Sequence, residues 1–290
     1  MALDGATSQG SSVTVTTAAQ YLPNLWADEL IKARNKAIVM VDKIMHVSPM
    51  GLKYGNTVTI PRLSNEVALD KSAETAVTFS AATETKVTVN ITKFKYVAKL
   101  IEDIVDVQSK YDLFSNYRDK IAHALAEVVD ADILALTQGV TQSTGQIGAA
   151  GLSISEAMIL TGIRMLDAAN VPQDNRYLVV DAYGREDLLS IQNFVRYDAG
   201  GKAPAGVMNG VIGEAYGVKI LFSNQVYITA TSVFGMMFHS DAFAIALQKD
   251  VTVKTEYSVD YIGTKLVGYE IYGVTLARTD HVVLMRYVQS

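Results

Sequence analysis

The sequence predicts an α+β protein organised around one long helix, and three patterns carry this prediction. Within residues 111–138, apolar side chains recur every three or four residues, which is the spacing of an amphipathic helix. Alternating apolar and polar residues at 57–60, 86–92 and 251–261 predict strands on both sides of that helix. Residues 151–245 mix helical and short apolar segments, which is typical of a compact α/β domain.

Composition narrows the class of protein. A chain of 290 residues with 49% apolar content can bury a large core, as one large or two moderate domains. The formal charge of -5 argues against a dedicated nucleic-acid binder. The chain has no cysteine, which rules out disulfides and thiolate chemistry. Without a secretion signal or a membrane-length apolar run, it is expected to be soluble and to remain in the cytoplasm where it is made.

The N-terminal segment is predicted to have little structure of its own. Residues 1–17 are rich in Gly, Ser and Thr and contain few apolar anchors, so a mobile arm is expected. Pro23 suits a first helical turn, and Leu22, Trp26 and Leu30 follow at four-residue spacing. A short helix is therefore expected here, with Trp26 as a packing anchor rather than a ligand platform.

Residues 55–95 predict an extended hairpin. Thr57 to Ile60 alternate and Pro61 closes this first strand, while Lys86 to Thr92 form the second. The polar stretch between them, 62–85, is too long for an ordinary loop of a compact domain, so a two-stranded projection is the better interpretation. An isolated hairpin is only marginally stable, so this one needs a neighbour to lie on, and another chain is one candidate.

The buried face changes at the end of this hairpin. Val87, Val89 and Ile91 share one phase, but the apolar residues resume out of phase at Phe94 and Tyr96. A slip of one residue turns the buried face over, so a bulge or bend is expected at 92–93. The long helix follows at 111–138 and would be about 40 Å long at ~1.5 Å per residue. Arg118, Glu127 and Asp130 lie off its apolar stripe and are expected on its polar face.

The α/β segment can be divided by its start and stop signals. Ser153 and Glu156 stand at capping-box spacing before a helix that Asn170 should end. A strand is expected at 176–181, a second helix from Gly184, a flexible glycine-rich loop at 198–217, and further strands at the ranges 218–222 and 281–288. In the segment 251–261, Val251, Val253, Tyr257, Val259 and Tyr261 share one face, which predicts an antiparallel strand with its other face in solvent.

No arrangement of residues makes a positive case for catalysis. His46, His123, His239 and His281 are scattered without paired ligand spacing, which makes a metal site improbable. His239-Ser240-Asp241 contains the residue types of a catalytic triad, but neighbours on an extended chain point to opposite faces, so a strand end followed by an Asp or Ser cap is expected.

Two further candidates for a functional site, one acid-base and one phosphate-binding, are also weak. Glu102, Asp103 and Asp106 form an acidic cluster that fits a solvated helix start better than acid-base chemistry. Gly201-Lys202 lacks the flanking residues of a phosphate-binding loop. We therefore expect no catalytic, cofactor-binding or metal-binding residues, and no enzyme.

Four segments carry a resemblance to a known family. VTTAAQYLPNLWADELIKAR, GNTVTIPRLSN, KYVAKLIEDIVDVQSKYDL and VPQDNRYLVVDAYGREDLL are similar to segments of tailed-bacteriophage major capsid proteins, and they lie within residues 13–190. The remainder of the chain matches this family by the order of its elements. The motifs are structural rather than chemical, and their specificity comes from their occurring in series.

The resemblance implies the fold shared by tailed-phage and herpesvirus shells, also called Hong Kong 97-like. It implies these parts: an N-terminal arm, 1–25; a peripheral domain, 26–54, 96–150 and 246–280, with a spine helix, 111–138; an extended loop, 55–95; and an axial domain, 151–245, to which the final strand 281–288 is added.

The same resemblance implies a structural role. Copies are expected to assemble in the bacterial host cytoplasm into hexamers and pentamers of an icosahedral virion capsid that encloses double-stranded DNA. Expected partners are portal, scaffolding and decoration proteins and non-specifically bound DNA, but no membrane. Some relatives cross-link a loop lysine to a neighbouring chain. Lys71 lies on this loop, but the flanking motif is not matched, so that role is not carried over.

Subunit contacts are expected near the tip of the extended loop, at Arg62, Asp70, Lys71 and Glu74. One alternative within the same fold is the shell of a bacterial nanocompartment that encloses enzyme cargo. A remote alternative is a monomeric hydrolase that uses Asp or Tyr residues of 151–245, since fold alone does not establish function.

Overall fold

The fold was analysed in a computed structural model of the whole chain. The chain divides into two compact units, Met1–Arg34 and Asn35–Ser290. The structure describes these parts of the second unit: residues 36, 38–47, 55–63, 68–77, 79, 84–109, 112–140, 145–191 and 213–288. The predicted arm, the helix after Pro23 and most of the glycine-rich loop lie outside the described residues.

The predicted long helix is α2, Leu113–Ala135, which continues into a short 3-10 turn, η3, Leu136–Gly139. It begins after Asp112 because that carboxylate accepts a hydrogen bond of 3.0 Å from the Ser115 amide, which caps the first turn. The side chains buried on α2 include Ile121, Leu125, Val129 and Ile133, at steps of four residues.

One residue of α2 lies on the opposite side from the one predicted. Asp130, expected on the polar face, is fully buried, and its carboxylate accepts hydrogen bonds from the amides of Met40 at 2.6 Å and Val39 at 3.3 Å. Burial raises the pKa of Asp130, and these backbone bonds act in the opposite direction. Asp130 therefore ties the segment before β1 to the helix.

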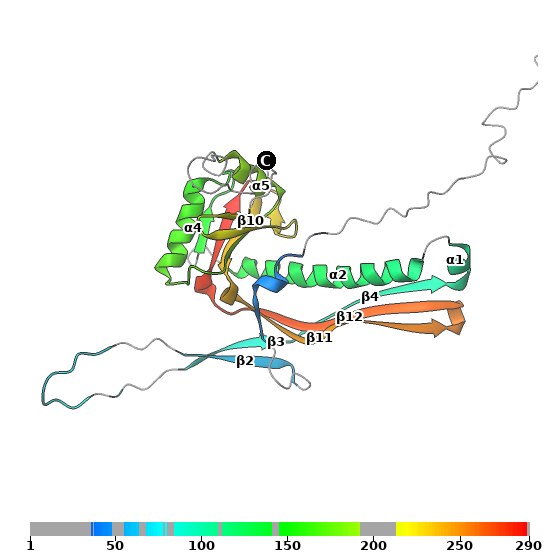
Figure 1. The fold of residues 1–290 in the computed structure, drawn as a ribbon, viewed down its shortest axis with the longest axis horizontal. Coiled ribbons are helices and arrows are strands. Elements are labelled where there is room, and N and C mark those ends of the chain that lie inside the picture. Colours follow the sequence, from blue (N-terminus) through cyan, green and yellow to red (C-terminus); the bar gives the residue numbers. More distant parts are fainter. Residues whose placement is uncertain are drawn as a thin grey trace, which may run out of the picture. The chain divides into compact units, whose positions relative to one another are not determined.

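A four-stranded sheet lies along α2 and has the order β1-β11-β12-β4 among the described residues. Its strands are β1, Met45–His46; β11, Phe243–Ser258; β12, Gly263–Leu276; and β4, Lys93–Glu102. Figure 1 shows α2 running beside the three long strands. Ile121 and Leu125 of α2 pack against Ile101 and Leu266 of the sheet.

The second sheet contains seven of the described strands, in the order β5-β13-β10-β6-β8-β7 with β9 paired to β10. They are β5, Gln146–Gly148; β13, Val282–Tyr287; β10, Ser232–His239; β6, Arg176–Val180; β8, Val218–Phe222; β7, Glu214–Ala215; and β9, Tyr227–Thr229. Helices α4, Glu156–Ala168, and α5, Ala182–Ser190, follow the predicted segments and contact this sheet. The largest core cluster includes Met237, Phe238 and Tyr287 of β10 and β13.

The predicted hairpin begins as a separate ladder of β2, Thr57–Arg62, and β3, Thr85–Asn90. Pro61 does not end β2 but lies within it, opposite Lys86, as an edge position allows. Val58, Val89 and the following Ile91 pack with Ala244 and Ala246 of β11. The ladder therefore packs against the four-stranded sheet around Val58 and Val89, near the start of β2 and the end of β3.

The expected bend at 92–93 is confirmed. β3 ends at Asn90 in the two-stranded sheet, and β4 begins at Lys93 in the four-stranded sheet. The change of buried face in the sequence therefore marks the point where the chain passes from one sheet to another.

Two predicted boundaries are corrected. Ser155, not Ser153, caps α4, because its hydroxyl accepts from the Met158 amide at 3.3 Å. The predicted end at Asn170 is confirmed by its left-handed φ of 55°. The strand expected at 251–261 ends at Ser258, and the residues that follow form the 3-10 turn η6, Val259–Tyr261.

Within the described ranges, no helix combines the length and apolar character needed to cross a lipid bilayer.

Candidate intersubunit surfaces

Three of the four predicted contact residues lie together at a turn. Asp70, Lys71 and Glu74 are all exposed, and the Thr75 hydroxyl donates a hydrogen bond of 2.7 Å to the Ser72 carbonyl. Glu74 has a left-handed φ of 64°, which reverses the chain there. These three side chains are free to meet a neighbouring molecule.

Arg62 lies elsewhere, which corrects its placement near the tip. It is the last residue of β2, in register with Thr85, and its guanidinium is 3.9 Å from the Asp280 carboxylate. Asp280 belongs to the 3-10 turn η7, Thr279–His281, which leads from β12 to β13. Arg62 therefore links the base of the loop to the body of its own subunit.

The part of the extended loop beyond the β2–β3 ladder, residues 63–84, exposes apolar side chains. Leu63, Leu69 and Phe79 are 76%, 72% and 92% exposed. The loop sequence also contains four carboxylates and one lysine. An acidic segment with uncovered large apolar side chains is suited to bind a surface that is both apolar and basic.

Such a surface, which we call the aromatic face, lies on the four-stranded sheet. Phe94 and Tyr96 of β4 are 63% and 69% exposed, and Phe94 packs edge to face on Tyr269 of β12 at 6.0 Å between ring centroids. Lys249 of β11 lies with its ammonium 4.9 Å from the Tyr269 ring centroid, and it lowers the pKa of that tyrosine. Ile271, on the same side of β12, packs with the β2–β3 ladder.

A second apolar surface, the tip patch, lies where the four-stranded sheet ends. The short helix α1, Asp103–Gln108, follows β4 and is linked to the turn between β11 and β12, because the Asp103 amide donates to the Ile262 carbonyl at 3.0 Å. Figure 1 shows α1 beside that turn. The tip patch consists of exposed side chains from both segments: Ile104, Val105, Val107, Val259, Tyr261 and Ile262.

The predicted acidic cluster borders this patch. The Tyr257 hydroxyl donates a hydrogen bond of 2.8 Å to the Asp103 carboxylate, which raises the pKa of Tyr257. The cluster stands at a solvated helix start, as predicted, because Glu102 is the N-cap of α1 and Asp103 and Asp106 lie in its first turn. This helix is separate from the long helix α2. The cluster fixes the position of α1 against β11.

A partly buried polar network lies between α2 and the sheet behind the aromatic face. The Asp132 carboxylate accepts from the Tyr272 hydroxyl at 2.6 Å and is 3.3 Å from Lys93 and 3.8 Å from Lys95. Glu270 is 2% exposed, and its Oε1 has no hydrogen-bond partner among the described residues. Burial, together with the negative charges of Asp250 and Asp132, raises the pKa of Glu270 to about 7.

Among the described residues, the histidines do not form a metal site. His46 and His123 have their Nε2 atoms 2.7 Å and 3.1 Å from the carbonyls of Val41 and Lys36. His239 ends β10, and its Nδ1 accepts from the amide of Asp241, so the capping group is the histidine rather than the predicted Asp or Ser. Across the described ranges, no cluster of three potential metal ligands occurs.

Comparison with solved structures identifies the fold. A chain from Mycobacterium phage Che8 is 26% identical with a TM-score of 0.78, covering 91% of this chain and 97% of that one. A chain of the cyanophage P-SCSP1u capsid is 18% identical with a TM-score of 0.77, covering 94% and 95%. A capsid chain of a native GTA particle is 11% identical with a TM-score of 0.71, covering 96% and 99%. The class is therefore the Hong Kong 97-like major capsid fold.

The family follows from the sequence match. The model of the phage capsid protein family matches residues 44–288, and the chain belongs to that family. It is a structural protein of the virion capsid, and its copies assemble into a multimeric shell. None of the curated proteins matches. Neither the cargo-enclosing nanocompartment nor the monomeric hydrolase is favoured by these findings.

Sequence reasoning missed the tip patch and the aromatic face. In the sequence, Phe94 and Tyr96 indicate only a change of phase, and Val259 and Tyr261 continue the apolar face of a half-buried strand. The available signal was the density of large apolar residues in two segments that topology brings together, 104–107 and 257–262. Only the pairing of β4 with β12 reveals that they meet.

Proposed function

We propose that this protein forms hexamers and pentamers of an icosahedral phage head that encloses double-stranded DNA, assembled in the bacterial host cytoplasm. Portal, scaffolding and decoration proteins would be its partners. The formal charge of -5 fits a protein that encloses DNA without binding it tightly. The parts around α2 would be the peripheral domain, and the seven-stranded sheet with β13 the axial domain. Membership of the phage capsid family supports this proposal.

The observation that carries the proposal is the tip patch. Val107 and Val259 are 84% and 78% exposed, and they come from two segments that hydrogen bonds and strand pairing hold together. Contiguous apolar side chains of this kind mark a protein interaction site. In a shell built from one kind of chain, the tip patch would bind the equivalent patch of further copies. Closure of the shell repeats this contact many times, so each contact can be weak.

The extended loop would lie on the aromatic face of a neighbouring copy. The loop offers Leu69 and Phe79 with an excess of carboxylates, while the aromatic face offers Phe94, Tyr96 and Lys249. Both sign of charge and apolar character are therefore complementary. Asp70, Lys71 and Glu74 at the turn are proposed as contacts, whereas Arg62 anchors the loop within its own subunit.

Replacing residues 63–84 by Asn-Gly tests this arrangement without disturbing the core. Arg62 and Thr85 are the last paired residues of the ladder, so a two-residue turn can join them. The variant should melt as the wild type does but remain small in size-exclusion chromatography. A second variant, F94S with Y96S, should show the same loss, and L152S, on an exposed residue outside both surfaces, should assemble normally. Normal shells from the loop replacement would reject the proposed role of the loop.

A further inference from the structure

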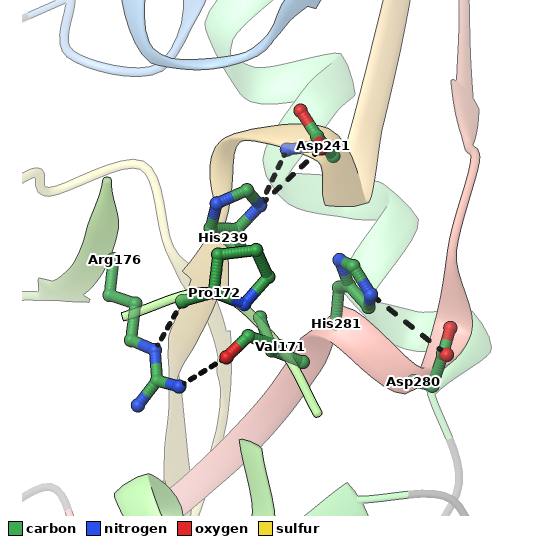
Figure 2. A network of polar contacts seen from close by, with 7 residues as sticks. All are labelled: Val171, Pro172, Arg176, His239, Asp241, Asp280 and His281. Carbon is green, nitrogen blue, oxygen red and sulfur yellow. Dashed lines mark hydrogen bonds and ion pairs between the residues drawn. The ribbon is translucent and has the colours of Figure 1, made fainter. Parts of the chain in front are cut away.

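Two histidines face each other where the chain crosses twice between the two sheets. One crossing runs from β10 to β11 through the turn η5, Ser240–Ala242, and the other from β12 to β13 through η7. His239 lies at the start of the first crossing and His281 at the end of the second. Figure 2 shows the two rings with their neighbouring carboxylates.

The rings pack against each other in a buried place. Their centroids are 5.7 Å apart in an edge-to-face arrangement, and each residue is only 5% exposed. The two crossings are also joined by backbone bonds, because the amides of Ala277 and Arg278 donate to the Ala242 carbonyl at 2.7 Å and 3.1 Å. The histidine pair therefore lies beside the bonds that hold the crossings together.

This arrangement requires neutral imidazoles. The Asp241 amide donates to Nδ1 of His239 at 3.2 Å, so in that ring Nδ1 must be unprotonated and the proton must be on Nε2. Nδ1 of His281 is buried and has no hydrogen-bond partner in the described protein. A proton added to His239 removes its cap, and a proton added at Nδ1 of His281 creates a buried charge without an acceptor.

The charged groups around the two rings would compensate a positive charge on the imidazoles only partly. Asp241 and Asp280 lie 3.8 Å and 4.0 Å from the rings of His239 and His281, but both carboxylates are about half exposed, and Asp280 is shared with Arg62. Arg278 adds positive charge next to His281. Arg176 of β6 is already bonded to the Asp167 carboxylate. It also donates to the carbonyls of Val171 and Pro172, as Figure 2 shows.

We propose that the facing His239 and His281 make the double crossing sensitive to acid: neutral rings hold it closed, and their protonation opens it. Two positive charges at this separation repel each other in a site that excludes most water. Burial lowers the pKa of His281 from its ordinary value of 6.5. For a histidine with a lowered pKa, the contribution to stability is complete above pH 6.5 and is lost as the pH falls below it. The inference concerns the single chain and does not depend on how the shell assembles.

Local hydrogen–deuterium exchange of the full-length protein tests this inference. Global unfolding would not isolate the effect of the histidines, because it also reports the titration of Glu270, which changes stability with pH in the opposite direction. After correction for intrinsic exchange, the Ala277 and Arg278 amides should lose protection about tenfold between pH 7.5 and pH 5.0. The amide of Val179 in the β6–β10 ladder should change little.

The double variant H239N and H281Q should keep its protection at both pH values, since asparagine retains an acceptor near the position of Nδ1 without titrating. The control variant H123Q, on a histidine far along the chain that bonds Lys36, should behave as the wild type does. Unchanged protection at 277 and 278 in the wild type would overturn the inference, whether or not the double variant folds. Equal loss in the double variant would overturn it too.

Discussion

The hydroxyl of Tyr272 donates a hydrogen bond of 2.6 Å to the carboxylate of Asp132, which joins the middle of β12 to α2. The same carboxylate lies near Lys93 and Lys95 of β4, so one side chain of the helix binds two adjacent strands. Tyr272 is fully buried. The contact sets how the long helix lies on the sheet that carries the aromatic face.

Removal of this hydroxyl should therefore destabilise the protein. Y272F leaves the ring in place but takes the donor away from a charged acceptor, which costs about 1–3 kcal/mol. Urea denaturation at pH 7 measures the difference. The matched control is Y257F, which deletes the hydroxyl that bonds Asp103 on an exposed surface and should change stability little. Equal effects of the two variants would show that burial of the Tyr272–Asp132 bond is unimportant.

Glu270 should give stability an unusual dependence on pH. Because its pKa rises from 4.5 to about 7 on folding, the folded state holds this proton more tightly than the unfolded state. Its contribution to stability is greatest below pH 4.5 and is lost as the pH rises through 7. The variant E270Q cannot ionise, so between pH 5 and pH 8 it should gain up to about 3 kcal/mol relative to the wild type.

Denaturation curves of both proteins at several pH values measure this difference. His281 titrates in both, so its effect cancels in the comparison. Parallel stability curves for wild type and E270Q would mean that Glu270 is charged in the folded protein throughout this range.

Gly268 should be intolerant of a side chain. A Cβ atom there would lie 2.2 Å from Cγ2 of Ile121, because β12 and α2 approach closely at this point. G268A should therefore cost about 1–3 kcal/mol through overpacking. G213A is the control, since a Cβ at Gly213 meets no described atom within 4 Å. Thermal melting of the two variants compares them, and a G268A protein as stable as G213A would contradict the packing described.

The tip patch should be needed for assembly but not for folding. V259D places a charge on a side chain that is 78% exposed, so the isolated subunit should lose little stability. If further copies cover this position, the charge is buried without a partner and shells should fail to form. Light scattering of assembly mixtures measures the effect. Assembly at the wild-type rate would place Val259 outside every subunit contact.

Much of the fold could be predicted because periodicity records which faces are buried. The four-residue spacing of Ile121 and Leu125 predicted α2, and the apolar run 177–180 predicted the strand β6, whose residues are all buried. The change of phase before Phe94 marked the passage between two sheets. These signals are local, since each depends on residues within one or two turns or one strand.

The surfaces could not be predicted, because they depend on long-range pairing. Val259 and Tyr261 continue an alternating pattern, and nothing local shows that the chain turns at η6 and leaves them exposed. Asp130 resembles a surface residue of a helix until Val39 and Met40 provide its buried donors. The sequence predicts Arg62 near the loop tip, because Pro61 is expected to end the strand. The ladder instead extends through Pro61 and places Arg62 next to Asp280.

Negative-stain electron microscopy of the purified, full-length protein tests the central claim most directly. We expect closed shells of uniform size built from many copies, and we expect the loop-replacement variant to give none. A wild-type protein that remains a 31.4 kDa monomer at high concentration, with no particles in the micrographs, would contradict the proposal that it forms a shell by itself.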